Sequence, residues 1–403
     1  MRGRMRWIAL GAVLALGVGI AAVAGAATTH KTHKWAGPPI LIGGAVDLTK
    51  NMAPFDAPAY QAAQIEIKKI NAAGGVLGRP LQLNVINDQL DPQKTKQAAL
   101  TQIGNGAVIG WVTCDVDYAT PAIQEFLKAK MLTIAPCIGT DEMGPSRFGA
   151  PGRLAFSYGN AAQDEGSAMA EYSFKKGWRS SVVVTDNLLR YFKDVCKAYT
   201  IRFKQLGGKV LSQESFTQGD KTIGNVVSRV DAKHPANIAF CTSFGGDQPA
   251  FVSGLRSLDN NTPIFNSWAG DGAYWWTKSP QVTNYYYVTY ASVWGDDPNK
   301  AVRQMEAVMK AQGQPAQTGG FVSGAAAIDG IATAIRIAKG STNGATLAAI
   351  MERYKNQPTI SGLVTFSPQF HSVTGRMYRV IRVNNNKGRL VGVLKAKSVA
   401  NIH

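Results

Sequence analysis

The chain has 403 residues, of which 45% are hydrophobic and 17% charged, and its formal net charge is +17. This length is enough for two or three domains. Because the basic residues are scattered along the chain and no nucleic-acid-binding motif is present, the charge does not indicate a nucleic-acid partner.

The first 26 residues have the pattern of a signal peptide. Residues 1–6 carry three arginines, residues 7–24 carry no charge, and residues 24–26 form a small-x-small cleavage site. The arginines are not adjacent, and no cysteine lies near the cleavage point, so we expect neither a twin-arginine signal nor a lipoprotein. The apolar run is also long enough to remain as an uncleaved anchor. We expect a linker at 27–37 and a mature protein that is periplasmic or secreted.

Short strands rich in Val and Ile then alternate with amphipathic helices. The first series has predicted strands at 40–46, 81–87, 107–112 and 131–136, with helices that end near residues 73, 103 and 130. A Gly- and Pro-rich stretch at 139–152 interrupts it. The second series has strands at 181–185, 209–216, 237–242 and 262–266, and helices at 190–206, 222–232 and 248–258. This alternation predicts an α/β protein with two lobes, each a parallel sheet with helices on both faces.

The last part of the chain continues with both element types. We predict an aromatic strand at 284–291, helices at 298–312, 320–339 and 345–354, and strands at 376–384 and 390–396. Spacing alone does not assign these elements to either lobe.

The most specific pattern is the helix–glycine–strand junction at residues 70–92, INAAGGVLGRPLQLNVINDQLDP. Gly74 and Gly75 end the helix, because Gly enters the left-handed cap conformation without steric cost. Asp91 and Pro92 begin the next helix as N-cap and first helical residue. This junction resembles the type I periplasmic binding proteins of ABC importers, and within them the branched-chain amino-acid binding family.

The resemblance implies two Rossmann-like lobes joined by a three-segment hinge, with crossings near residues 157, 290 and 368. Lobe 1 would comprise 38–157 and 291–367, and lobe 2 would comprise 158–290 and 368–403. The implied function is an extracytoplasmic, monomeric binding protein that closes on a small polar solute, an amino acid or a similar compound. It would deliver the solute to permease subunits with a cytoplasmic ATPase. The alternative is a sensor of the same fold for an amide, polyol or aromatic acid, acting with a separate signalling partner.

A ligand in such a fold is expected beyond the carboxyl ends of the strands. The resemblance implies that Phe55 stacks on the ligand, that Tyr191 closes over it, and that Asp271 pairs with an ammonium group. It also implies that the loop at 113–120 holds a carboxylate. The predicted ligand-binding residues are Phe55, Cys114, Asp115, Tyr118, Ile138, Gly139, Thr140, Tyr191, Ser243, Phe244 and Asp271.

Asp115 and Asp117 depart from the family pattern, which has serines in this loop. A ligand carboxylate would meet like charge there, which lowers affinity unless these side chains turn away. A polyol, an amide or a cation fits the two residues as well. Capping of the following helix is the alternative role for both side chains.

Four cysteines in an exported chain indicate disulfides. Cys114 and Cys137 each follow a predicted strand. If those strands are neighbours, their ends lie about 5 Å apart, within disulfide range. We therefore expect a Cys114–Cys137 bond. A Cys196–Cys241 bond follows by elimination, with two buried thiols as the alternative.

No motif in the chain indicates catalysis. The interior histidines are His234 and His371, and there is no Ser-His-Asp order, Gly-x-Ser-x-Gly, zinc motif or phosphate-binding loop. We expect no enzymatic activity, no metal site and no cofactor.

Overall fold

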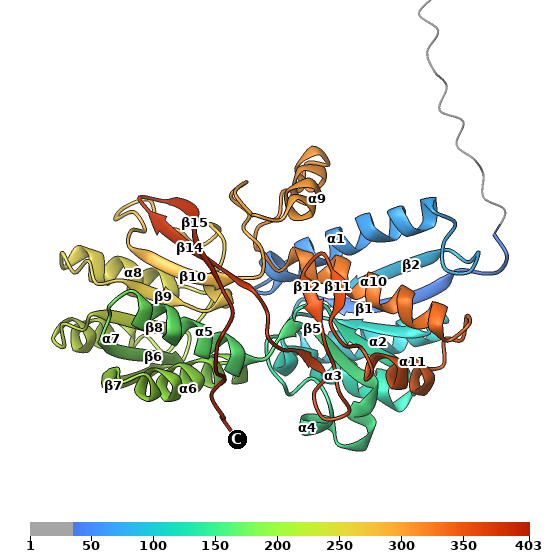
Figure 1. The fold of residues 1–403 in the computed structure, drawn as a ribbon, viewed down its shortest axis with the longest axis horizontal. Helices are drawn as coiled ribbons and strands as arrows, with labels where there is room; N and C mark the ends of the chain where they lie inside the picture. The colour runs from blue at the N-terminus through green and yellow to red at the C-terminus, as the bar shows by residue number, and fades with distance from the viewer. Residues whose placement is uncertain (1–34) are drawn as a thin grey trace, which may run out of the picture. The chain divides into compact units, whose positions relative to one another are not determined.

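The computed structural model describes residues 35–403, so the predicted signal peptide and residues 27–34 of the predicted linker lie outside the described part. These residues form one unit built on two sheets (Figure 1). None of the helices in residues 35–403 combines the length and hydropathy that a membrane-spanning segment needs.

The first sheet has six parallel strands in the order β13-β5-β4-β3-β1-β2. Their bounds are β1 (Ile40–Val46), β2 (Leu81–Asn87), β3 (Ile109–Val112), β4 (Leu132–Ala135), β5 (Ala155–Asn160) and β13 (Ser372–Val373). One face packs against α1 (Ala53–Ala72), α10 (Phe321–Ile337) and α11 (Gly344–Met351). The other face packs against α2 (Pro92–Gly104) and α3 (Val116–Lys128). The short helices α4 (Pro145–Phe148) and η1 (Ala150–Leu154) precede β5. We call this sheet with its helices the first lobe.

The second sheet has seven strands in the order β15-β14-β10-β9-β8-β6-β7. Their bounds are β6 (Ser180–Asp186), β7 (Lys209–Phe216), β8 (Asn237–Cys241), β9 (Ile264–Asn266), β10 (Tyr285–Thr289), β14 (Tyr378–Asn384) and β15 (Lys387–Leu394). One face packs against α5 (Ala162–Lys175) and α6 (Arg190–Gln205), and the other against α7 (Ile223–Asp231) and α8 (Asp247–Ser257). We call this sheet with its helices the second lobe. The remaining elements are η2 (Trp268–Gly270), α9 (Lys300–Ala311), β11 (Gln357–Thr359) and β12 (Gly362–Val364).

In the second sheet, β14 is antiparallel to both of its neighbours, β10 and β15, whereas the other neighbouring strands are parallel. The turn between β14 and β15 accounts for the second of these pairings. Asn385 and Asn386 join them, and both residues have positive φ angles, of 48° and 55°. Two consecutive positive φ angles are typical of the type I′ turn of a hairpin, which reverses the chain direction at once. The parallel arrangement predicted from the sequence therefore ends at this edge of the sheet.

The sequence patterns predicted no element at β5 or α5. β5 reads AFSYGN and is buried along its whole length, so it shows neither a Val/Ile run nor alternation. α5 is buried on almost every side and includes the buried polar residues Gln163, Asp164 and Glu165. A helix without a wet face has no amphipathic period to detect.

The chain passes between the lobes through three segments that contact one another, as expected of a three-segment hinge. Arg376 donates hydrogen bonds to the carbonyl oxygens of Tyr158 (2.7 Å) and Gly159 (3.1 Å). Its guanidinium lies 4.3 Å from the ring centre of Tyr290, whose hydroxyl bonds to the side chain of Asn160. These contacts tie together the ends of β5, β10 and β13. The residue boundaries given for the lobes from the sequence stay a prediction.

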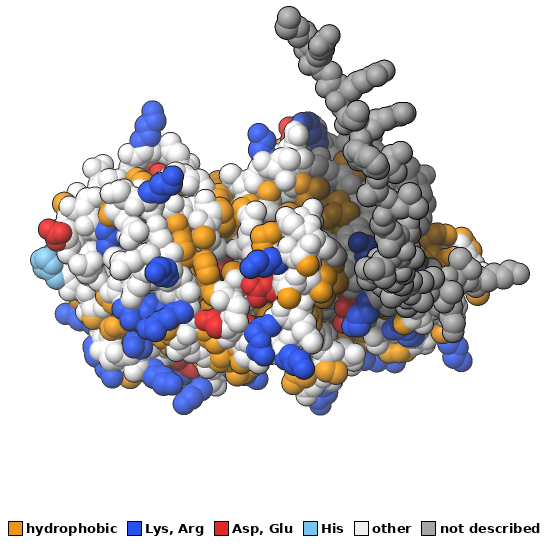
Figure 2. Space-filling view, turned by 90° about the horizontal axis from the view of Figure 1, so that it is seen from above, with side chains coloured by type: hydrophobic (Ala, Val, Ile, Leu, Met, Phe, Trp, Pro, Cys, Tyr) orange, Lys and Arg blue, Asp and Glu red, His pale blue; other side chains and the backbone are white. Residues whose placement is uncertain are grey.

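The positive charge of the chain does not form one continuous stripe on the face seen in Figure 2. Lys and Arg side chains there stand in several separate groups with neutral surface and some acidic side chains between them. This distribution lacks the concentrated basic surface typical of nucleic-acid binding.

Candidate functional site

A cavity lies where the carboxyl ends of the two sheets face each other. Its lining follows six strands, β1, β3 and β4 of the first lobe and β6, β8 and β9 of the second. The lining residues are Met52, Phe55, Cys114, Asp115, Gly139, Leu189, Tyr191, Phe192, Ser243, Phe244, Trp268 and Ala269. This position agrees with the rule that ligands bind beyond the carboxyl ends of the strands.

Seven of the eleven predicted ligand-binding residues line this cavity together. They are Phe55, Cys114, Asp115, Gly139, Tyr191, Ser243 and Phe244. The other four do not line it: Tyr118 follows Asp115 by one turn of α3, and the carbonyls of Ile138 and Thr140 accept hydrogen bonds from Ser157 and Ser372. Asp271 is fully buried elsewhere. Contact of these residues with a ligand stays a prediction.

Asp271 joins the second lobe to the segment that precedes α10 of the first lobe. Its carboxylate accepts hydrogen bonds from the Thr289 hydroxyl and the Gly319 amide, each at 2.6 Å. Burial raises the pKa of this carboxyl to about 6. Because Asp271 does not line the cavity, pairing with a ligand ammonium would require a rearrangement of this loop.

The cavity is small in this arrangement of the lobes, because aromatic rings fill most of the space. Its volume is about 20 Å³, which is enough for roughly one water molecule. The Phe55 ring meets the Trp268 ring edge to face, with ring centres 5.0 Å apart, and lies 6.1 Å from the Tyr274 ring. A solute of amino-acid size therefore enters only if the lobes separate or these rings rotate.

Asp115 caps helix α3 and also lines the cavity. Its Oδ1 accepts hydrogen bonds from the backbone amides of Asp117 (2.9 Å) and Tyr118 (3.2 Å). This is the capping role that the sequence left as an alternative. Burial, with the nearby Asp117 charge, raises the pKa of Asp115 to about 7.

Glu165 connects the lobes at the cavity and was not identified from the sequence. Its carboxylate accepts hydrogen bonds from the Tyr191 hydroxyl (2.8 Å), the Trp268 amide (2.5 Å) and the Asn160 side chain (2.8 Å). Burial raises the pKa of this carboxyl to about 7. No sequence signal pointed to Glu165, because it lies on α5, where the pattern predicted no helix.

Both predicted disulfides are present. Cys114 and Cys137 follow the neighbouring strands β3 and β4, with Cα atoms 4.7 Å apart. Cys196 on α6 and Cys241 at the end of β8 have Cα atoms 5.9 Å apart. The Cys114–Cys137 bond joins the loops that follow β3 and β4 at the cavity. The Cys196–Cys241 bond joins α6, the helix that carries Tyr191, to the end of β8.

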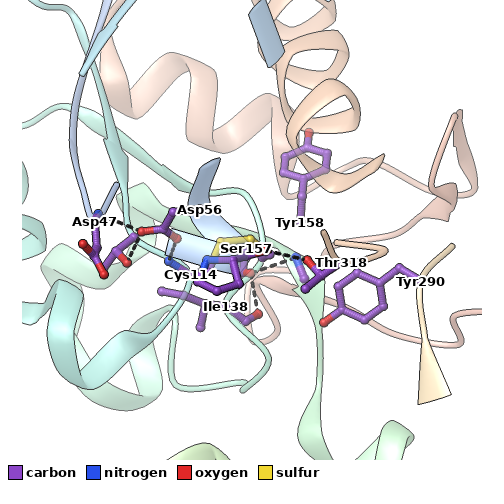
Figure 3. The surroundings of a disulfide bond; sticks show 12 residues. Asp47, Asp56, Cys114, Ile138, Ser157, Tyr158, Tyr290 and Thr318 are labelled. Carbon is purple, nitrogen blue, oxygen red and sulfur yellow. Dashed lines mark hydrogen bonds between the residues drawn. A yellow bond between two sulfur atoms is a disulfide. The ribbon is translucent and has the colours of Figure 1, made fainter. Parts of the chain in front are cut away.

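Asp56 lies beside the Cys114–Cys137 bond, where its carboxylate organises the ends of β1 and β3 (Figure 3). It accepts hydrogen bonds from the amides of Asp47 (2.9 Å) and Cys114 (2.8 Å) and from the Thr113 hydroxyl (2.5 Å). Burial raises its pKa well above the usual range. Asp56 and the two cysteines are the one group of three possible metal ligands found in residues 35–403. Because both thiols are in the disulfide, this group does not offer a metal site.

Ion pairs cross between the lobes at the rim of the cavity. Arg190 of the second lobe lies 3.3 Å from Glu142 of the first lobe and 2.9 Å from Asp194. The backbone amide of Arg190 also donates to Asp117 at 2.9 Å. Arg147 pairs with Asp117 (2.9 Å) and Glu142 (2.7 Å). The basic groups at this rim are therefore already bound to acidic ones.

Comparison with known proteins gives a consistent family. The model of a family described as periplasmic binding protein matches residues 39–389. A Leu/Ile/Val-binding protein homolog from Brucella melitensis is 23% identical over 331 residues, covering 81% of this chain and 87% of that protein. A Leu/Ile/Val-binding protein from Rhizobium johnstonii is also 23% identical, with the same coverage of both chains.

Solved structures share the fold at lower identity. The substrate-binding protein LivJ from Streptococcus pneumoniae, in complex with isoleucine, has a TM-score of 0.76 at 17% identity, covering 89% of this chain and 99% of that one. A solute-binding protein from R. palustris, in complex with benzoate, has a TM-score of 0.74 at 16% identity, covering 90% and 98%. These two neighbours hold chemically different ligands on one fold.

Proposed function

Because the chain belongs to the type I periplasmic binding protein family, we propose that it is the extracytoplasmic substrate-binding component of an ABC importer. The observation that carries this proposal is the cavity at the six strand ends, lined by residues of both lobes. Three connecting segments in mutual contact provide a hinge about which two such lobes can close on a solute. The matched curated relatives are named as binding proteins, which agrees with the expectation that the chain is not an enzyme.

The proposal includes a location and a partner. The family is periplasmic, and we propose that residues 1–26 direct export and that the protein is not a lipoprotein. The partner would be a membrane permease with a cytoplasmic ATPase, to which the closed monomer delivers its solute. The solute class from the sequence is an amino acid or a similar small polar compound.

Because aromatic side chains fill the cavity, the lobes would have to open before a solute can bind. Since the cavity volume is about 20 Å³, the described arrangement is a closed one without room for an amino acid. Opening would expose Asp115, Ser243 and the aromatic rings of both lobes, and a solute would then replace some of the contacts between the lobes on closing.

The test uses the purified protein and a broad set of small solutes: amino acids, amides, polyols, aromatic acids and amines. A cognate solute should raise the melting temperature and change the radius of gyration measured by small-angle X-ray scattering. Native mass spectrometry of the protein as purified should detect a solute carried through purification. If no solute in the set changes either quantity and no carried-over molecule is found, the binding role is refuted.

A further inference from the structure

The backbone amides at the end of β3 are already bound to carboxylates of this chain. The Cys114 amide donates to Asp56 at 2.8 Å, and the Asp117 and Tyr118 amides donate to Asp115 at 2.9 and 3.2 Å. Free amides at a helix N-terminus are the groups that bind a ligand carboxylate. Here Asp115 occupies that position itself, so the Asp117 and Tyr118 amides of α3 are not free to bind an anionic ligand.

No basic side chain balances Asp115 within the cavity wall. Among the described residues that line the cavity, none is Lys, Arg or His. Arg147 and Arg190 at the rim are paired with acidic side chains. Lys50 lines a separate, neighbouring cavity of about 190 Å³ that shares only Phe244 with this one. The Arg147 charge acts on Asp115 from outside the wall, where Arg147 is paired with Asp117 and Glu142. A carboxylate entering the site would thus lose its hydration and face Asp115 with no basic side chain in the wall to pair with it, which costs affinity.

Aromatic rings make up much of the remaining wall. Five lining residues are aromatic: Phe55, Tyr191, Phe192, Phe244 and Trp268. They come from both lobes, and the centres of neighbouring rings lie 5.0 to 6.4 Å apart. The face of an aromatic ring attracts a cation, and this attraction strengthens where water is excluded. Rings around a single carboxylate therefore suit a positively charged group attached to an apolar body.

We infer that the solute accepted by this cavity is a small organic cation, an amine or quaternary ammonium compound, that has an apolar body and no free carboxylate. This inference rests on the proposed binding function, but it excludes amino acids from the solute class because they carry a free carboxylate. Asp115 would face the cationic group, and the rings of Phe55, Tyr191 and Trp268 would enclose it when the lobes close.

The burial of Asp115 gives a property by which the two classes of ligand can be distinguished. Its pKa is raised to about 7 because the carboxyl is buried near Asp117. A ligand cation would favour the ionised form and so release the proton that burial favours. An anionic ligand would favour the protonated form instead, so the two classes of ligand shift this pKa in opposite directions.

Two pairs of probes differ in charge while keeping shape. Benzylamine and benzoate share a ring and carry opposite charges, and leucinamide is leucine with its carboxylate masked. Affinity should be measured for all four by isothermal titration calorimetry at pH 8, where Asp115 is largely ionised. Benzylamine should bind at least tenfold more tightly than benzoate, and leucinamide at least tenfold more tightly than leucine.

The variant Asp115→Asn removes the charge but keeps a side chain that caps helices well. It should lower the affinity for the bound amine at least tenfold, a difference of about 1.4 kcal/mol. Asp91→Asn is the matched control, since Asp91 caps α2 through the Lys94 amide at 2.8 Å and does not line the cavity. Asp91→Asn should leave the affinity unchanged, and the melting temperatures of both variants report whether they fold.

The outcomes separate this inference from the proposed function. If benzoate or leucine binds as tightly as its cationic counterpart, or if Asp115→Asn binds the amine as the wild type does, the inferred solute class is wrong while the binding function stands. If none of the four probes binds, the molecule detected by native mass spectrometry decides: a carboxylate overturns the inference, and a cation without one supports it. If nothing binds and nothing is carried over, the binding function itself fails.

Discussion

The contact between Gly139 and Tyr191 offers a direct test of how the lobes meet. Gly139 follows β4 of the first lobe, and the Tyr191 ring comes from the start of α6 in the second. A Cβ atom added at Gly139 would lie 2.6 Å from one ring carbon of Tyr191 and 2.9 Å from the next. Carbon atoms in contact lie about 3.5–4.0 Å apart, so the Gly139→Ala variant forces the ring back by roughly 1 Å.

The size of the effect follows from what the ring holds. The Tyr191 hydroxyl donates to the buried Glu165 at 2.8 Å, and a hydrogen bond to a charged group contributes about 1.5–3 kcal/mol. Loss of this bond should disfavour the closed arrangement by about 2 kcal/mol, which changes the ratio of closed to open molecules by roughly 30-fold. Solute affinity should fall with the closed population.

Small-angle X-ray scattering of the solute-free protein checks this expectation, with a larger radius of gyration predicted for Gly139→Ala. Gly246→Ala is the control, because Gly246 is exposed near the same cleft and an added Cβ there would meet no atom within 4 Å. An unchanged scattering profile for Gly139→Ala, with wild-type melting, would refute the idea that Tyr191 rests on Gly139 in solution.

Three further changes test the parts around the site. The pKa of Glu165 is raised from 4.5 to about 7 in the folded protein, so its contribution to folding stability is present below pH 4.5 and lost as the pH rises through 7. Between pH 5 and pH 8, urea unfolding should show that Glu165→Gln loses about 2–3 kcal/mol less stability than the wild type. Equal losses would contradict the raised pKa. Replacing Cys196 and Cys241 together by serine opens a loop of 45 residues. Denaturant titration should show that the free energy of unfolding falls by about 4 kcal/mol. A loss below about 1 kcal/mol would argue against this disulfide. Arg379→Ala removes the ion-pair partner of the buried Asp297 carboxylate, and the same titration should show a loss of about 3–5 kcal/mol in the free energy of unfolding. Arg229→Ala, at a half-exposed ion pair, should lose less than about 1 kcal/mol. Similar losses for both variants would show that burial does not set the difference.

The organisation of the chain was readable from the sequence because it depends on local patterns. The alternation of Val/Ile-rich strands with amphipathic helices predicted two α/β lobes, and the junction at residues 70–92 indicated the family. The strand-end rule and the family resemblance together gave eleven candidate ligand-binding residues, seven of which line one cavity. Cys114 and Cys137 each follow a predicted strand, and the bond expected if those strands are neighbours is present.

Helices and strands without a periodic hydrophobic pattern could not be predicted from the sequence. β5 and α5 are buried on nearly all sides, so neither shows the polar face on which sequence periodicity depends. The antiparallel edge of the second sheet also required the structure. β14 runs against β10 after the chain returns from β13 in the first sheet, and the turn at Asn385 and Asn386 then reverses β15 relative to β14.

The chemistry of the cavity was decided by tertiary structure alone. The sequence places Asp115 and Asp271 beside strand ends. Only the fold shows that Asp115 caps α3 and faces the cavity, while Asp271 is buried away from the cavity and bound by Thr289 and Gly319. Glu165 reaches the site from a helix that the sequence pattern did not reveal. Side-chain direction and the approach of one lobe to the other depend on contacts between residues distant in sequence, and local periodicity carries no information about those contacts.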